Sequence, residues 1–73
     1  MKAVKYMMQA QKSVWGVTIR LLDREAATLA MSYTFTGFTV DDAVAHANKK
    51  LAPFGYEVVG AATEKEIDAY YDS

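Results

Sequence analysis

The fold is decided by the stretch from Thr28 to Leu51, which reads TLAMSYTFTGFTVDDAVAHANKKL. Apolar and polar side chains alternate along its first part, and this period of two predicts a β-strand over Thr28–Thr36. Gly37 permits a turn, and a helix is predicted from Thr39 to Ala52. Because these are the clearest strand pattern and the clearest helix pattern in the chain, we expect the helix to pack on the strand.

The predicted strand has one face for the core and one face that stays open. Its core row is Leu29, Met31, Tyr33 and Phe35. Its second row is Thr28, Ala30, Ser32, Thr34 and Thr36. Strict alternation is typical of a strand with one buried face, so the second row is expected to meet water or a partner.

The predicted helix carries signals at both of its ends. Thr39 is an N-cap residue, and Asp42 three positions later completes an approximate capping box. Pro53 and Gly55 indicate where the helix ends. Its apolar stripe consists of Val40, Ala43, Val44, Ala47 and Leu51.

Three more strands and a second helix are predicted outside this stretch. Alternation predicts strands over Ala3–Gln9 and Val14–Leu22, and a short fourth strand over Tyr56–Ala61. Thr63 and Glu66 form a capping box that begins a short C-terminal helix.

The predicted fold class is therefore α+β, with an antiparallel-dominated four-stranded sheet and one main helix on one face, in the order β-β-β-α-β-α. Residues 1–73 are expected to form a single small domain. A right-handed crossover makes the fourth strand parallel to the first or the third, and the sequence leaves both open. Asp23–Ala26 is assigned to a hairpin connection. Gly16 indicates a β-bulge or a close approach by another segment, and a bulge is the commoner cause.

The composition argues against catalysis. The chain has no cysteine, which excludes disulfides and thiolate metal sites, and His46 is its one histidine. His46 flanks the apolar stripe, so a solvated position is favoured over a catalytic base. The four glycines are scattered and form no phosphate-binding loop. We predict no enzymatic activity, no cofactor and no metal site.

Charge and hydropathy indicate a cytoplasmic protein. No apolar run approaches the ~20 residues of a membrane helix, and the opening residues have no signal-peptide pattern. The net charge is −1, but residues 1–20 carry only cations and residues 54–73 carry five acids against one lysine. Either a basic first hairpin and an acidic tail meet a partner, or the two ends attract each other within the fold.

The open face of the sheet or the first hairpin is the candidate binding surface. If the first two strands pair, Lys5 and Arg20 share that face with Ser32 and Thr34. With a sequence pI near 5.7, direct nucleic-acid binding is disfavoured, and recognition of a larger protein or ribonucleoprotein complex is favoured. The candidate contact residues are Lys5, Tyr6, Trp15, Arg20, Ser32 and Thr34.

The first residues, Met1-Lys2-Ala3-Val4-Lys5-Tyr6, carry a Met-Lys-x-x-Lys-Tyr pattern. This pattern resembles the opening of small phage-encoded anti-CRISPR proteins of the type I-F family, over the first half of the chain. The resemblance implies a sheet backed by helices, a contact role for Tyr6, and steric inhibition of a Cascade-like defence complex in a bacterial host cytoplasm. The family's second-strand tyrosine and third-strand glutamate are replaced here by Arg20 and Met31.

Two further functions are compatible with the sequence. The Gly37–Leu51 turn and helix is similar to the Gly-x-Thr-x-x-Glu-Ala helix of HicB-type antitoxins, which implies an antitoxin-like or nucleic-acid-binding regulatory module. A structural homo-oligomer is the other alternative, because an open threonine-rich face can pair with a second copy. The sequence favours the inhibitor over both.

Overall fold

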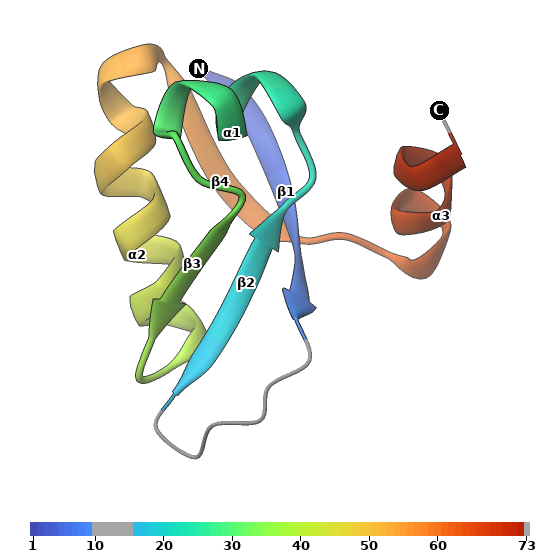
Figure 1. Cartoon of the computed structure of the whole chain (residues 1–73), viewed down its shortest axis with the longest axis horizontal. Coiled ribbons are helices and arrows are strands. Elements are labelled where there is room, and N and C mark those ends of the chain that lie inside the picture. The colour runs from blue at the N-terminus through green and yellow to red at the C-terminus, as the bar shows by residue number, and fades with distance from the viewer. Residues whose placement is uncertain (10–15, 73) are drawn as a thin grey trace.

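The structure is a computed structural model that describes residues 1–9 and 16–72. Its elements are β1 (Lys2–Gln9), β2 (Val17–Leu21), α1 (Arg24–Ala30), β3 (Thr34–Gly37), α2 (Val40–Leu51), a 3-10 turn (Ala52–Phe54), β4 (Tyr56–Ala61) and α3 (Glu64–Asp72). The predicted α+β class and its four-stranded sheet are confirmed. Figure 1 shows the long helix α2 on one side of the sheet and α3 on the other. No helix in the described ranges has the length and apolar content needed to cross a membrane.

The sheet has the strand order β3-β2-β1-β4. The β1/β2 and β2/β3 pairs are antiparallel, whereas β4 runs parallel to β1. The sheet therefore resolves the choice that the sequence left open, because the crossover through α2 places the fourth strand beside the first. Val4 pairs with Val58 and Lys5 with Gly60, so Val59 is an extra residue that forms a bulge in β4.

The core lies between the sheet and α2, as the apolar stripe predicted. Ala43, Ala47 and Leu51 of α2 are buried, and the alanines let the helix approach the strands closely. The sheet side of the core consists of Val4, Ile19, Leu21, Phe35, Tyr56 and Val58. Thr39 caps α2 as predicted, since its hydroxyl accepts a hydrogen bond from the Asp42 backbone N–H at 3.2 Å.

The predicted strand over Thr28–Thr36 is wrong in its first half, because residues 24–30 form the helix α1. Asp23, assigned to a hairpin connection, is the N-cap of this helix, and its carboxylate accepts a bond from the Ala26 N–H at 2.8 Å. The buried residues of α1 are Ala26 and Ala27, whereas Leu29 is 37% exposed and Met31 is 91% exposed. The apolar residues that alternate along this stretch are therefore largely exposed. Residues 24–30, with the sequence REAATLA, form a helix because most of these residues have a high helix propensity.

Met31 ends α1 in a left-handed conformation, with φ 59° and ψ 27°. Its N–H bonds to the Ala27 and Thr28 carbonyls, which is the usual geometry of a helix C-terminus but with methionine in place of glycine. A left-handed conformation is unfavourable for a residue with a Cβ. Because the chain turns at Met31, Ser32 and Tyr33 are enough to connect α1 to β3, which begins at Thr34.

Gly37 and Gly16 are required by close backbone packing. A Cβ on Gly37 would lie 2.5 Å from the Ala43 nitrogen, at the start of α2. A Cβ on Gly16, just before β2, would collide with the Gly37 carbonyl. Of the two causes proposed for Gly16, the close approach is the one observed.

Two polar contacts fix β4 against the helices. The Asn48 side chain of α2 accepts a 2.7 Å hydrogen bond from the Val58 N–H. At the start of β4, a hydrogen bond from Tyr56 to the Glu25 carboxylate raises the pKa of the phenol to about 12, with burial as a second cause. Tyr56 is 3% exposed, so this contact ties α1 to the edge of the core.

Candidate protein-binding face

The sheet face opposite α2 carries polar, cationic and apolar side chains together. We call it the open face. Strand alternation and the pairing registers place nine side chains of β1, β2 and β3 and of the β2 end on it. They are Ala3, Lys5, Met7, Gln9, Thr18, Arg20, Leu22, Thr34 and Thr36.

Arg20 lies at the centre of the open face. It pairs with Met7 on one neighbouring strand and with Thr34 on the other. Its guanidinium carbon is 4.8 Å from the centre of the Tyr33 ring, a cation–π distance. The contact keeps the planar fork in place while the side chain remains half-buried, so the orientation of its donors is restricted before any partner arrives.

Hydroxyl groups line the open face beside Arg20. The Thr18 and Thr36 hydroxyls are hydrogen-bonded to each other at 3.0 Å across β2 and β3. Ser32 precedes β3, and its hydroxyl donates to the Thr34 carbonyl and accepts from the Thr34 N–H. Ser32 therefore shapes the entry to β3, whereas Thr18 and Thr36 offer their remaining hydrogen-bonding capacity outward.

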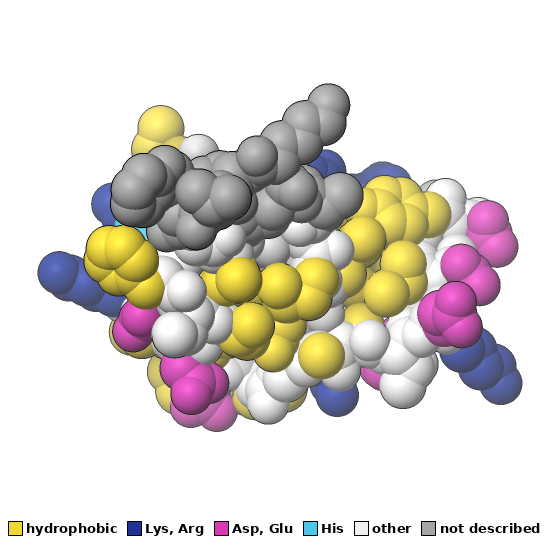
Figure 2. All heavy atoms as spheres, turned by 90° about the horizontal axis from the view of Figure 1, so that it is seen from below, with side chains coloured by type: hydrophobic (Ala, Val, Ile, Leu, Met, Phe, Trp, Pro, Cys, Tyr) yellow, Lys and Arg dark blue, Asp and Glu magenta, His cyan; other side chains and the backbone are white. Residues whose placement is uncertain are grey.

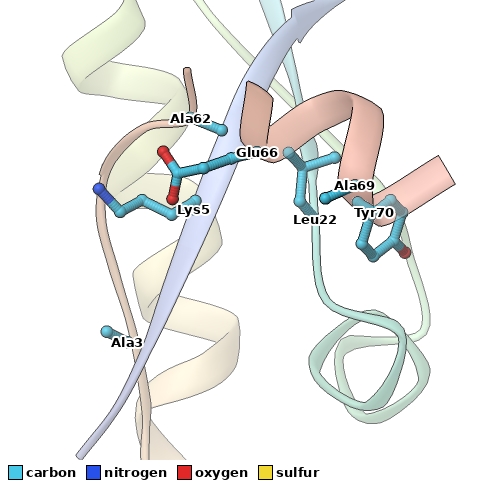
Figure 3. Close-up of a pocket in the computed structure, with 7 residues that line it drawn as sticks. All are labelled: Ala3, Lys5, Leu22, Ala62, Glu66, Ala69 and Tyr70. Atoms are coloured by element: carbon cyan, nitrogen blue, oxygen red, sulfur yellow. The ribbon is translucent and has the colours of Figure 1, made fainter. Parts of the chain in front are cut away.

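Helix α3 covers part of the open face, over β1 and the end of β2. Figure 3 shows Glu66 of α3 directed toward Lys5 and Ala69 beside Leu22, whereas Ala3 lies further along β1 at the edge of the same hollow. A hollow of about 400 Å³ remains between the helix and the strands. The Tyr71 hydroxyl bonds to the Met7 sulfur at 3.6 Å, and the Arg24 guanidinium lies 5.7 Å from the centre of the Tyr70 ring.

A capping box begins α3, and its glutamate is directed toward Lys5 of the strand beneath. The predicted capping box is confirmed, because Thr63 N–H donates to the Glu66 carboxylate at 2.9 Å and Glu66 N–H donates to the Thr63 hydroxyl. These bonds to Thr63 are the main reason that the pKa of Glu66 is lowered, and the nearby Lys5 lowers it further. Lys5 of β1 thus favours the charged form of Glu66 on α3.

The structure brings together three of the six predicted contact residues. Lys5, Arg20 and Thr34 lie on the open face, and Ser32 stands at its border. Tyr6 points to the opposite face, where it is half-buried against the core, so it lies outside the open face and its contact role stays a prediction. Trp15 lies outside the described residues.

The neighbourhood of Tyr6 is a second apolar region of the molecule. Met8, two residues further along β1, is 45% exposed, and Val40 and Val44 of α2 are, like Tyr6, partly buried against the core. Figure 2, seen from below, shows hydrophobic side chains across the middle of the molecule and carboxylates toward both of its ends. The open face differs from this region because it combines apolar side chains with Arg20 and Lys5.

Sequence reasoning missed three residues of the open face and its cover. Tyr33 was predicted in the core row but lies over Arg20, because it precedes β3 and its side chain is 37% exposed. Met7 of β1 and Tyr71 of α3 were given no role by the sequence. The signal that was available is the tyrosine pair at 70 and 71, which gives α3 an aromatic side facing the sheet.

The titratable residues of the described ranges include no group of three or more His, Cys, Asp or Glu that could hold a metal ion. His46 lies on α2, where its Nδ1 is 3.4 Å from the Thr36 carbonyl and its ring packs edge-on against Phe35. This arrangement connects the middle of α2 to β3.

The chain has no match among protein-family models, curated proteins or solved structures. The geometry of the open face and the residues themselves therefore carry the functional argument.

Proposed function

We propose that this chain is a non-catalytic protein-binding module that acts by occupying a surface of a larger complex through its open face. The observation that carries the proposal is the Arg20–Tyr33 pair, set between Met7 and the threonines of β2 and β3. Arginine, tyrosine and methionine are enriched in protein interfaces, and a pre-oriented arginine loses less entropy when it binds.

The composition of the face favours a protein over a nucleic acid. Lys5 and Arg20 are its cations, and the carboxylates of Glu57 and Glu66 lie on the same side of the sheet. A face of mixed sign attracts phosphate backbones weakly, whereas it suits a partner with a complementary pattern of charges and apolar groups. The expected partner presents a carboxylate to Arg20 beside an apolar side chain for Met7.

The test is capture of partners from a bacterial lysate with three tagged proteins. The first is the wild type, the second carries Lys5→Glu and Arg20→Glu, and the third carries Lys49→Glu and Lys50→Glu. Both pairs change the net charge equally, but Lys49 and Lys50 lie at the end of α2, across the sheet from the open face. We expect only the open-face variant to lose its partner while all three retain their thermal unfolding.

Equal capture by all three proteins would remove the open face from consideration. Loss of capture by both double variants would indicate non-specific charge effects instead. Retention that depends steeply on salt and is abolished by nuclease would favour a nucleic-acid-binding module.

The resemblance of the opening residues makes a type I-F Cascade-like complex the first partner to test. We propose steric inhibition of such a complex as the biological role. Expression of the chain in a bacterium whose type I-F system targets a phage is expected to restore plaque formation. If plaques stay suppressed while capture still depends on Lys5 and Arg20, the binding function stands and its target is a different complex.

A further inference from the structure

Helix α3 is held to the rest of the molecule by few and shallow contacts. None of its residues is buried, and Ile67 and Tyr70 are the ones that reach even half-burial. Its connection to β4 is short, consisting of Ala62 and Thr63. A nine-residue helix is too short to be stable alone in water, so α3 depends on its docking and belongs to the least stable part of the fold.

The chemistry of α3 complements the sheet under it. Four carboxylates, those of Glu64, Glu66, Asp68 and Asp72, lie on the helix against one lysine. The surface beneath provides Lys5, the Arg24 guanidinium near Tyr70, and the apolar side chains of Met7 and Leu22. The hollow between them shows that α3 does not fill the space that this surface offers.

We infer that α3 is a displaceable cover, and that the surface of Ala3, Lys5, Met7 and Leu22 takes an acidic amphipathic helix with aromatic side chains from the partner. The inference rests on the proposed function, since it names the kind of partner segment that the open face binds. α3 is the internal example of such a segment: an acid one turn ahead of two tyrosines, with Glu66 toward Lys5 and Tyr71 toward Met7. Displacement of α3 would join the covered surface to the exposed half around Arg20.

An internal cover lowers the apparent affinity for any competing helix. A short linker gives the tethered segment an effective concentration in the ~mM range, so an external helix must compete with it. Weakening the tethered copy raises the fraction of molecules with a vacant surface, and the apparent affinity for the external helix rises by the same factor.

The test uses the full chain and a synthetic peptide of residues 62–72 as the probe. The peptide is titrated into the wild type and into Tyr71→Ala, with methyl NMR of the labelled methionines as the readout. We expect the Met7 methyl signal to move in both, with binding to Tyr71→Ala at least about tenfold tighter. The control is Phe54→Ala, which removes an exposed aromatic side chain of the 3-10 turn, outside α3 and the open face, and is expected to bind the peptide as weakly as the wild type does. A control peptide with Glu66→Lys and Tyr71→Ala is expected to bind neither protein.

Equal affinity of the peptide for the wild type and Tyr71→Ala, or a response of Met8 in place of Met7, would overturn the inference. So would a control peptide that binds as well as the natural one. Lysate capture separates the two proposals. Capture that requires Arg20 and is unchanged in Tyr71→Ala contradicts the cover and leaves the proposed function intact. Peptide binding without any Arg20-dependent capture supports the cover and contradicts the proposed function.

Discussion

Replacement of Gly37 by alanine tests how β3 and α2 are packed together. The new Cβ would lie 2.5 Å from the Ala43 nitrogen and 2.7 Å from the Asp42 carbonyl carbon. Contacts under 3.0 Å are essentially never seen for a real Cβ, and two of these atoms belong to the backbone of α2, which has no flexible end to move aside. The first turn of α2 must therefore shift away from β3, together with the Thr39 cap.

The cost follows from the usual penalty for overpacking, which is ~1–3 kcal/mol, and backbone partners favour its upper end. A chain of this size has a free energy of unfolding of ~4–11 kcal/mol, so a loss of ~3 kcal/mol is a large part of it. At ~4–8 °C per kcal/mol, the midpoint of thermal unfolding should fall by at least ~10 °C. Circular dichroism melting and urea denaturation both measure this loss.

Gly60→Ala is the matched control. Gly60 is also a strand glycine, but a Cβ there meets no atom within 4 Å and its φ is not in the left-handed region. That substitution is expected to stabilise the chain by ~0.4–1 kcal/mol, because alanine has less freedom to lose on folding. If the two variants melt within a few degrees of each other, the close approach of α2 to β3 is refuted.

Three further substitutions test the remaining supports of the fold. Met31→Gly relieves the left-handed conformation at the end of α1 and should raise the free energy of unfolding by ~1 kcal/mol, measured by urea denaturation; a decrease would contradict the strain. Asn48→Ala leaves the part-buried Val58 N–H without its acceptor and should cost ~1–3 kcal/mol in the same assay, while Asn48→Asp keeps an acceptor and should cost less. The lowered pKa of Glu66 means that its cap on α3 is present above the ordinary pKa of glutamate and is lost as the pH falls through the lowered value. NMR of the Thr63 and Glu66 amides should show this loss with the core intact, and Glu66→Gln should abolish the pH dependence.

The elements that could be predicted are those whose local signals agree with their burial. The strand predicted over Tyr56–Ala61 has the bounds of β4. The predicted capping residues Thr39 and Thr63 each directly precede the helix that they cap. The prediction for residues 24–36 was wrong in part because two patterns overlap there. The alternation from Leu29 to Phe35 indicated a strand, while Asp23 and the alanines after it favoured a helix that buries Ala26 and Ala27. Helix propensity and capping outweighed a period of two whose apolar members are largely exposed.

The candidate site was predictable only as far as strand alternation reaches. Lys5, Arg20 and Thr34 were placed on one face because the side-chain period in a strand is two. The Arg20–Tyr33 contact was not predictable, because Tyr33 lies just outside β3 and its side chain follows no strand period. The cover by α3 depends on the direction in which the chain leaves β4, which short-range sequence signals do not determine.

The most direct test of the open face as the binding surface compares two neighbouring methionines. Met7 and Met8 are adjacent on β1, and Met7 pairs with Arg20 on the open face while Met8 pairs with the core residue Ile19 on the other. The chain with ¹³C-labelled methionine methyl groups is mixed with the captured partner, and both methyl signals are followed by NMR. We predict that the Met7 signal shifts or broadens on binding and that the Met8 signal keeps its position. A complex in which Met8 responds and Met7 does not would contradict the open face as the binding surface.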